Sequence, residues 1–428
     1  MPDASNARSR LLQFAFALAA VTYLDRVCIS AAAPAIMEEL DLSVWQMSVV
    51  FSAFTLAYSL FEVPSGRLGD TVGPRRVLTR IVLWWSAFTM ATGAAAGFAS
   101  LLVVRFLFGA GEAGAFPNIS QAFSRWFPLR ERGKANGVLF FGSRLGGAVA
   151  PSLAFLLIHA LGWRTAFVVF GSVGVVWALA WHGWYRDDPA RHASVDANEL
   201  AWIRQDGPAP IAGAVEPVPW RRFLTSANLY AICGMYFSFG YGLYFYFTWL
   251  PTYLIRVLGF SVLAGGLFAG LPFVLAGVAD LVGGWLTDRL AARRGLWAAR
   301  SGLGAAAFAT CAALVFASTA TESVVAKAVL IAFALASADL GLSAAWAVCL
   351  DVGARHAGVV TGFMNTSGNL GGFVGPLVLG YVVDRYGSWS IPFYITAAVY
   401  LAGAVLWLFI DPSRQLGDAA SEVAPPSR

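Results

Sequence analysis

The sequence predicts an all-α membrane protein with twelve transmembrane helices in two six-helix, pseudo-symmetric halves. Of its 428 residues, 58% are hydrophobic and only 12% are charged, whereas soluble proteins carry about 25% charged residues. Twelve runs are apolar over the roughly 20 residues that a spanning helix needs, six before residue 185 and six after residue 227. This composition excludes an ordinary soluble enzyme, a disordered protein and a nucleic-acid binder, because in water the chain would expose much apolar surface.

The twelve predicted spans alternate with short polar loops. They cover residues 11–36, 44–66, 76–97, 101–126, 131–159, 163–184, 228–255, 261–288, 299–318, 324–351, 357–384 and 389–410. The only long polar stretch lies between the sixth and seventh spans, and we interpret it as a cytoplasmic linker. The predicted parts are an N-terminal six-helix bundle, this linker, a C-terminal six-helix bundle and a cytoplasmic tail, at residues 1–184, 185–227, 228–412 and 413–428.

The positive charges predict the orientation of the chain. With both termini inside, 22 of the 29 Lys and Arg residues lie in cytoplasmic segments, as the positive-inside rule requires. Residues 1–10 are polar and lack the apolar core of a cleavable signal, so the first span is expected to act as an uncleaved insertion signal. We therefore expect a multi-pass protein of the bacterial inner membrane with both termini in the cytoplasm.

An internal repeat relates the two halves. Residues 66–76 read G-R-L-G-D-T-V-G-P-R-R after the second span, and residues 284–289 read G-W-L-T-D-R after the eighth. The first loop resembles the signature loop of the major facilitator superfamily, whose members are transporters. Its first glycine allows close helix approach, its aspartate can face a helix end or an arginine, and its arginines suit the anionic headgroup layer. The conformational-gating residues predicted from the two loops are Gly66, Asp70, Arg75, Arg76, Asp288 and Arg289.

Charged residues at membrane depth are concentrated in the first half. Asp25 and Arg26 lie in the first span, Arg105 and Glu112 in the fourth, and Arg144 in the fifth. Such residues normally face a cavity or a partner, because burying a charge in the bilayer is costly. Three arginines against two carboxylates leave a surplus positive charge, which a carried anion could neutralise. The alternative is a set of buried ion pairs that only fixes helix packing.

Several segments resemble one branch of that superfamily, the anion:cation symporter family. The most specific reads R-F-L-F-G-A-G-E-A-G-A-F-P-N at 105–118, and it is supported by Y-L-D-R at 23–26, T-W-L-P-T-Y-L at 248–254 and G-F-M-N-T-S-G-N-L-G-G at 362–372. Members include bacterial importers of hexonates, hexuronates and aldarates, together with sialin and the vesicular glutamate transporters. The resemblance covers nearly the whole chain except the linker and tails.

The resemblance implies roles for individual residues. Asp25 and Glu112 would form the protonatable pair, Arg105 would be a switchable partner of Glu112, and Arg26 would contact a substrate carboxylate. The other residues that would line the site are Tyr58, Tyr244, Asn365 and Asn369. For these, an ordinary helix–helix hydrogen bond is the alternative.

Arg144 departs from the family pattern, which has a small or neutral residue at this position. A second guanidinium could bind a second carboxylate or a hydroxy-acid group in a bidentate manner, which favours a dianion such as an aldarate. The alternative is a structural ion pair with Glu62, Asp280 or Asp339.

Together these features predict a secondary active transporter that takes up an organic anion with protons by alternating access. The expected substrate is a sugar acid (hexonate, hexuronate or aldarate) or a related carboxylate. The open alternatives are sodium in place of protons, a proton-antiport exporter of drugs or metabolites, and a non-transporting anion-sensing receptor. The sequence contains no HExxH motif, nucleophile elbow or metal-ligand cluster. We therefore expect no enzymatic activity, cofactor, metal or nucleic-acid partner, and we expect a monomer in the lipid bilayer.

Overall fold

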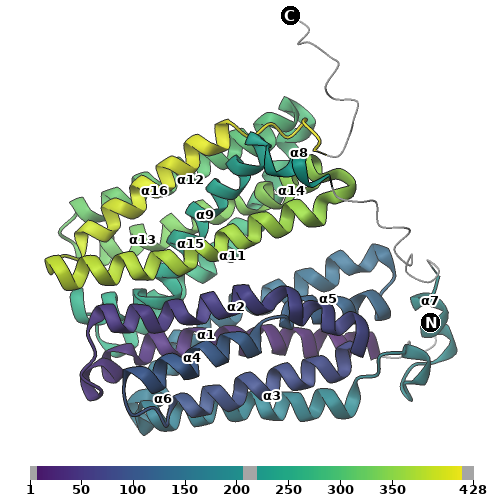
Figure 1. Cartoon of the computed structure of the whole chain (residues 1–428), viewed down its shortest axis with the longest axis horizontal. Coiled ribbons are helices and arrows are strands. Elements are labelled where there is room, and N and C mark those ends of the chain that lie inside the picture. The colour runs from purple at the N-terminus through teal and green to yellow at the C-terminus, as the bar shows by residue number, and fades with distance from the viewer. Residues whose placement is uncertain (1–6, 206–218, 417–428) are drawn as a thin grey trace, which may run out of the picture. The chain divides into compact units, whose positions relative to one another are not determined.

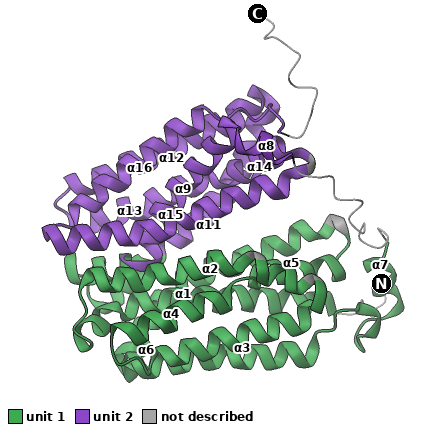
Figure 2. Cartoon of the chain, in the orientation of Figure 1, with its two compact units in different colours: residues 1–215, 250–270 green, residues 216–249, 271–428 purple. Residues whose placement is uncertain are grey.

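The computed structural model describes residues 7–205 and 219–416, most of which are helical (Figure 1). Contacts divide the chain into two compact units, unit 1 with residues 1–215 and 250–270 and unit 2 with residues 216–249 and 271–428 (Figure 2).

The helices of unit 1 in chain order are α1 (Ala7–Glu39), α2 (Val44–Val72), α3 (Pro74–Thr92), α4 (Phe98–Glu112), α5 (Ala115–Trp126), α6 (Leu129–Trp184), η1 (Pro189–Arg191) and α7 (Ala197–Ile203), to which the segment 250–270 adds α10 (Leu250–Thr252), η2 (Tyr253–Val257) and the start of α11 (Val262–Trp297). Unit 2 contains α8 (Trp220–Leu224), α9 (Ala227–Thr248), the rest of α11, η3 (Ala298–Gly302), α12 (Leu303–Ala320), α13 (Val324–Leu340), α14 (Leu342–Gly353), η4 (Ala354–His356), α15 (Ala357–Tyr386) and α16 (Ser390–Leu408).

The predicted spans all fall on helices. Within the described residues, seven helical stretches are long and apolar enough to cross a membrane. Two of them, Glu131–Trp184 and Val262–Ala320, are 54 and 59 residues long. Each contains two predicted spans, divided at Gly162 (φ 77°) or Gly295 (φ 82°). The seven stretches do not include three of the predicted spans, which lie on α3, α9 and α15. The predicted fold class of helical membrane protein is therefore confirmed.

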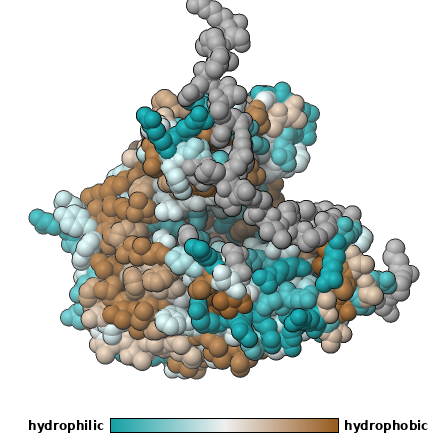
Figure 3. Space-filling model, turned by 45° about the vertical axis from the view of Figure 1, so that its right-hand side comes forward, coloured by the Kyte–Doolittle hydropathy of each residue, from teal (hydrophilic) through white to brown (hydrophobic). Residues whose placement is uncertain are grey.

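The outer surface carries large apolar side chains. Leu281, Phe409 and Val176 are 78%, 71% and 68% exposed. Figure 3 shows a broad area of apolar residues on one face of the molecule, with hydrophilic residues gathered to either side of it. In water such a surface would be unstable, whereas in a bilayer it contacts lipid chains that are as apolar as itself. The backbone polar groups of these segments are satisfied within the helices, as the hydrocarbon core requires.

The fourth predicted span is broken into α4 and α5, which the sequence analysis did not anticipate. Gly114 joins them with φ 90°, and a Cβ at this glycine would lie 2.4 Å from Cβ of Ser65. Both constraints favour glycine. The amide of Asn118 donates to the carbonyl oxygens of Gly114 (2.7 Å) and Ser65 (3.1 Å), so it satisfies acceptors that the break leaves open. The tenth predicted span is also divided, at Gly341 between α13 and α14, but there the backbone keeps a right-handed helical conformation (φ −79°).

The first part of the predicted linker packs against unit 1. Arg8 at the start of α1 pairs with Glu199 of α7 (3.0 Å) and with Glu131 of α6 (2.5 Å), and the Trp202 indole donates to Glu131 (3.1 Å). The predicted linker and tail also include residues 206–218 and 417–428, which lie outside the described residues.

The segment 250–270 groups with unit 1, although the predicted boundaries assign it to the second half. It packs closely on α6, because a Cβ at Gly270 would lie 2.1 Å from the Ala148 carbonyl oxygen. Arg256 also pairs with Glu38 at the end of α1 (2.7 Å). These contacts concern how the segment packs. The domain boundaries predicted from the sequence stay a prediction.

Candidate functional site

Five of the predicted site residues lie on three neighbouring helices of unit 1. Asp25 and Arg26 come from α1, Tyr58 from α2, and Arg105 and Glu112 from α4. Asp25 and Glu112 are completely buried and Arg105 is 2% exposed. Burying four ionisable groups in one helical bundle is expensive unless they compensate one another or serve a ligand. We call Asp25, Arg26, Arg105 and Glu112 the charged cluster.

Local packing explains how α4 presents its two charged residues. Gly109 lies between them, and a Cβ there would lie 2.4 Å from the carbonyl oxygen of Phe54 on α2. Only glycine allows the two backbones to approach this closely. Arg105 and Glu112 are therefore held against α2, and Glu112 is the last residue of α4, directly before the break.

Glu112 forms its ion pair with Arg26, through the guanidinium Nε and the carboxylate Oε1. The same guanidinium lies over the rings of Tyr58 (4.7 Å to the centroid) and Tyr23 (5.5 Å). The resemblance suggested Arg105 as the switchable partner of Glu112. Arg105 lies within electrostatic range of Glu112, but Glu112 is bonded to Arg26 in this structure.

Some polar atoms of the charged cluster have no hydrogen-bond partner within the described residues. These atoms are both carboxylate oxygens of Asp25, Nε of Arg105 and Oε2 of Glu112. Asp25 lies within electrostatic range of Glu112 and Arg105. A buried polar group without a partner costs about 1–3 kcal/mol, and more if it is charged. Such groups are the natural places for a proton or an anion to bind.

Arg144 lies in the same unit but away from this cluster along the helix axis. Gly142 packs on Phe16 and Gly146 on Ala20, so α1 and α6 run parallel and Arg144 is level with Leu18. That position is seven residues before Asp25, or roughly 10 Å at 1.5 Å per residue. Its side chain is half-buried.

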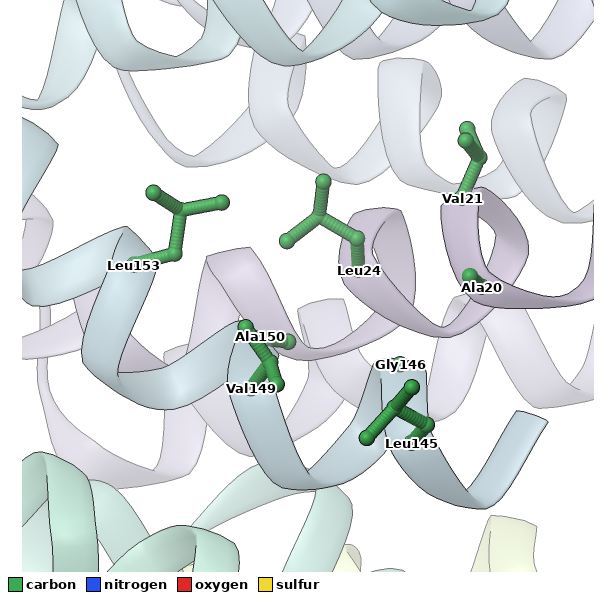
Figure 4. Close-up of a pocket in the computed structure, with 8 residues that line it drawn as sticks. All are labelled: Ala20, Val21, Leu24, Leu145, Gly146, Val149, Ala150 and Leu153. Carbon is green, nitrogen blue, oxygen red and sulfur yellow. The ribbon is translucent and has the colours of Figure 1, made fainter. Parts of the chain in front are cut away.

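An apolar groove follows the same pair of helices (Figure 4). The residues that line it are Ala20, Val21, Leu24, Leu145, Gly146, Val149, Ala150 and Leu153. Among the described residues, only apolar ones line it, so this groove offers nothing to hold a charged solute.

The other predicted lining residues belong to unit 2. Tyr244 of α9 is buried and packs against α15, where a Cβ at Gly372 would lie 2.3 Å from the tyrosine ring. Asn365 and Asn369 are half-buried on α15. Asp339 of the same unit is completely buried. It lies two residues before Gly341, and Glu112 in unit 1 likewise lies two residues before Gly114.

The predicted gating loop is anchored to the end of α6. The Arg75 backbone N–H donates to Asp187 (3.1 Å), and its guanidinium donates twice to the carbonyl oxygen of His182 (3.0 and 2.7 Å). Asp187 also pairs with Arg125 (3.5 Å).

Gly66 in the same loop is tied to α5, because its carbonyl oxygen accepts a hydrogen bond from the side-chain amide of Gln121 (3.1 Å). A Cβ at Gly66 would lie 3.4 Å from Pro117, whereas Arg76, Asp288 and Arg289 are exposed. The side chain of Asp70 lies outside the described residues. In the part of the chain that the structure describes, no group of three or more His, Cys, Asp or Glu side chains could hold a metal ion.

Sequence reasoning missed two aromatic residues beside the charged cluster. Phe54 lies 5.4 and 5.3 Å from the guanidinium carbons of Arg26 and Arg105, and the Trp85 indole lies near Asp25. The spacing of Phe54 and Tyr58, one helical turn apart, could have indicated a shared face. Nothing in the sequence identifies Trp85.

Comparisons with known proteins point to one family. The Major Facilitator Superfamily profile matches residues 15–376 and 352–427. Over 393 residues the chain is 37% identical to a protein of Cupriavidus necator named as a probable sulfoacetate transporter, covering 92% of this chain and 91% of the relative. It is 29% identical over 408 residues to the hexuronate transporter of Bacillus subtilis, covering 94% of each.

A solved structure supports the fold. The bacterial homologue of the human lysosomal transporter Spinster, in an inward-facing and occupied conformation, superposes with a TM-score of 0.78 at 18% identity, covering 95% of this chain and 97% of that one. At this identity the likeness concerns the fold alone. From the profile match and the 37% identity over nearly the full length, the chain belongs to the Major Facilitator Superfamily, a family of membrane transporters and not of enzymes, and its relatives agree with the expected anion:cation symporter branch.

Proposed function

We propose that this protein takes up a small organic anion together with protons, as a secondary active transporter working by alternating access. The observation that carries the proposal is the charged cluster, in which two guanidinium groups and two carboxyl groups share one buried region of unit 1. A structural ion-pair network would satisfy its members, whereas both oxygens of Asp25 lack a hydrogen bond within the described residues.

The charge balance supports a coupling mechanism. With both carboxyl groups ionised, the cluster is neutral, and Glu112 occupies Arg26. With both protonated, the cluster carries a formal charge of +2 and its guanidinium groups can bind an anion. Burial without hydrogen bonds disfavours a charged carboxylate, so protons and anion would enter together. In the more alkaline cytosol the protons leave, the carboxylates recapture the arginines, and the anion is released.

The expected substrates are small carboxylates that carry hydroxyl groups or a second negative charge. A sugar acid (hexonate, hexuronate or aldarate) remains the first candidate class. The Cupriavidus relative named for sulfoacetate adds a compact dianion with one carboxylate and one sulfonate, which suits a cluster charge of +2. We place the protein in the bacterial inner membrane as a monomer with both termini in the cytoplasm, and we assign conformational gating to the loop around Arg75.

A substrate panel tests this proposal. The purified protein is screened by thermal shift against sulfoacetate, a hexuronate such as glucuronate, galactonate and an aldarate, each beside its neutral alcohol analogue. A hit is then tested for uptake into proteoliposomes with an inward proton gradient. We expect stabilisation by one or more acids but not by the matched alcohols, and uptake that the gradient drives. Stabilisation by organic cations only would instead identify an exporter. So would transport in which the substrate and the protons cross the membrane in opposite directions.

A further inference from the structure

Phe54 contacts both arginines of the charged cluster. Its ring centroid lies 5.4 Å from the guanidinium carbon of Arg26 and 5.3 Å from that of Arg105. Both distances fall within the 6 Å at which a cation is attracted to an aromatic face. The two arginines come from different helices, α1 and α4, and Phe54 comes from a third, α2.

Further rings extend this contact on each side. Arg26 also lies over Tyr58 (4.7 Å), one turn along α2, and Arg105 lies over Phe108 (4.3 Å) on its own helix. Phe54 packs against both of these rings, with centroid separations of 6.0 Å to Tyr58 and 5.5 Å to Phe108. Each guanidinium therefore has an aromatic neighbour of its own, and the two share Phe54.

The backbone leaves Phe54 little freedom to move. The close approach of Gly109 places α4 directly on the Phe54 carbonyl and Cα, at 2.4 and 3.1 Å from a Cβ built there. The residue itself is only 6% exposed. An aromatic side chain has two χ angles and stays in staggered rotamers, so the ring is a rigid surface between two long, flexible arginine side chains.

We propose that Phe54 is a positioning residue for anion binding, because its ring holds Arg26 and Arg105 toward one common point. When Asp25 and Glu112 are protonated, the two guanidinium groups of the cluster repel each other. The ring face is polarised negative and attracts both cations without neutralising them. It thereby keeps the guanidinium groups in place while their hydrogen-bond donors stay available. This inference rests on the proposed anion transport.

Replacement of Phe54 by fluorinated phenylalanines tests the inference without changing the packing. Successive fluorines withdraw charge from the ring face but keep the shape of the side chain, so the cation–π attraction falls stepwise while the fold persists. The series is made at Phe54, and a matched series is made at Phe170, which is 1% exposed on α6. The readouts are KM and the pH profile of uptake in proteoliposomes, with sulfoacetate or glucuronate as the probe, whichever the wild type transports.

We expect KM to rise stepwise with fluorination at Phe54, by about tenfold for the trifluoro ring, which corresponds to about 1.4 kcal/mol. The pH profile should shift in the same series, and Phe54→Tyr should retain the wild-type values. Neither readout should change at Phe170. A flat KM across the Phe54 series, or an equal effect at Phe170, would overturn the positioning role. A wild type that transports no organic anion would instead end the proposed function, before any variant is made.

Discussion

Replacement of Glu112 by glutamine separates the coupling role of this residue from its packing role. Gln keeps the shape and an oxygen acceptor for Arg26 but cannot exchange a proton or carry charge. In the wild type the Glu112 side chain is completely buried and that of Arg26 is 13% exposed, so their pair is shielded from solvent. Removing one partner of such a pair costs about 3–5 kcal/mol, because a charge is left buried alone.

An anion should restore much of that loss in the Glu112→Gln variant, since it would take the place of the missing carboxylate. At 100 times its dissociation constant, a ligand stabilises the folded state by about 2.7 kcal/mol. We therefore expect a lower Tm without substrate, an unusually large increase in Tm with substrate, substrate counterflow close to wild type, and no accumulation driven by a proton gradient. Tm is measured on purified protein, and counterflow and accumulation are measured in proteoliposomes.

Glu131→Gln is the matched control. Its pair with Arg8 (2.5 Å) lies at the bundle end, with side chains 24% and 30% exposed. Such pairs are worth about 0–1 kcal/mol. This control should accumulate substrate like the wild type and should gain no extra stabilisation from the anion. Proton-driven accumulation by the Glu112→Gln variant at the wild-type level would refute the coupling role.

Three further results are expected. Arg26→Ala should weaken anion binding by one to two factors of ten, since a charge-assisted hydrogen bond is worth about 1.5–3 kcal/mol, and an anion titration followed by thermal shift measures this; wild-type affinity would contradict the contact. Gly109→Ala should lower Tm, because the new Cβ would lie 2.4 Å from the Phe54 carbonyl oxygen and overpacking costs about 1–3 kcal/mol; an unchanged Tm would mean that α2 and α4 can separate freely. Burial lowers the pKa of His192 in the folded protein. As the pH falls below about 6.5, the unfolded chain therefore takes up a proton on this histidine before the folded chain does, and the folded state loses stability. The fall in Tm between pH 7 and 5.5 should be smaller in the His192→Phe variant, and an equal fall would exclude His192 as the cause.

Much of the fold could be predicted because the bilayer imposes strong and simple constraints. Every span had to be a run of about 20 apolar residues, and all twelve predicted runs are helical. The break after Glu112 escaped prediction. It is marked by the positive φ of Gly114 (90°) and by the close approach of Ser65 from another helix. Such a constraint depends on tertiary packing, which a hydropathy pattern does not contain.

The candidate site, too, could be predicted from the sequence only in part. Asp25, Arg26, Arg105 and Glu112 were identified because charges are rare at membrane depth, and the structure brings them together in unit 1. Their pairing was less predictable. Glu112 shares a helix face with Arg105 but forms its ion pair with Arg26. The spacing of residues along one helix predicts contacts within that helix and not contacts with another helix. Phe54 was missed because phenylalanine is ordinary in an apolar span and only its position gives it a role.

Simultaneous recording of anion and proton fluxes tests the central claim most directly. Proteoliposomes containing the purified protein and an internal pH-sensitive dye are given an inward gradient of the substrate anion at equal pH on both sides. If buried carboxyl groups bind protons so that the arginines can bind an anion, uptake should acidify the lumen, and Asp25→Asn with Glu112→Gln should abolish the acidification. Uptake that leaves the lumen pH unchanged, or that requires sodium, would contradict the account.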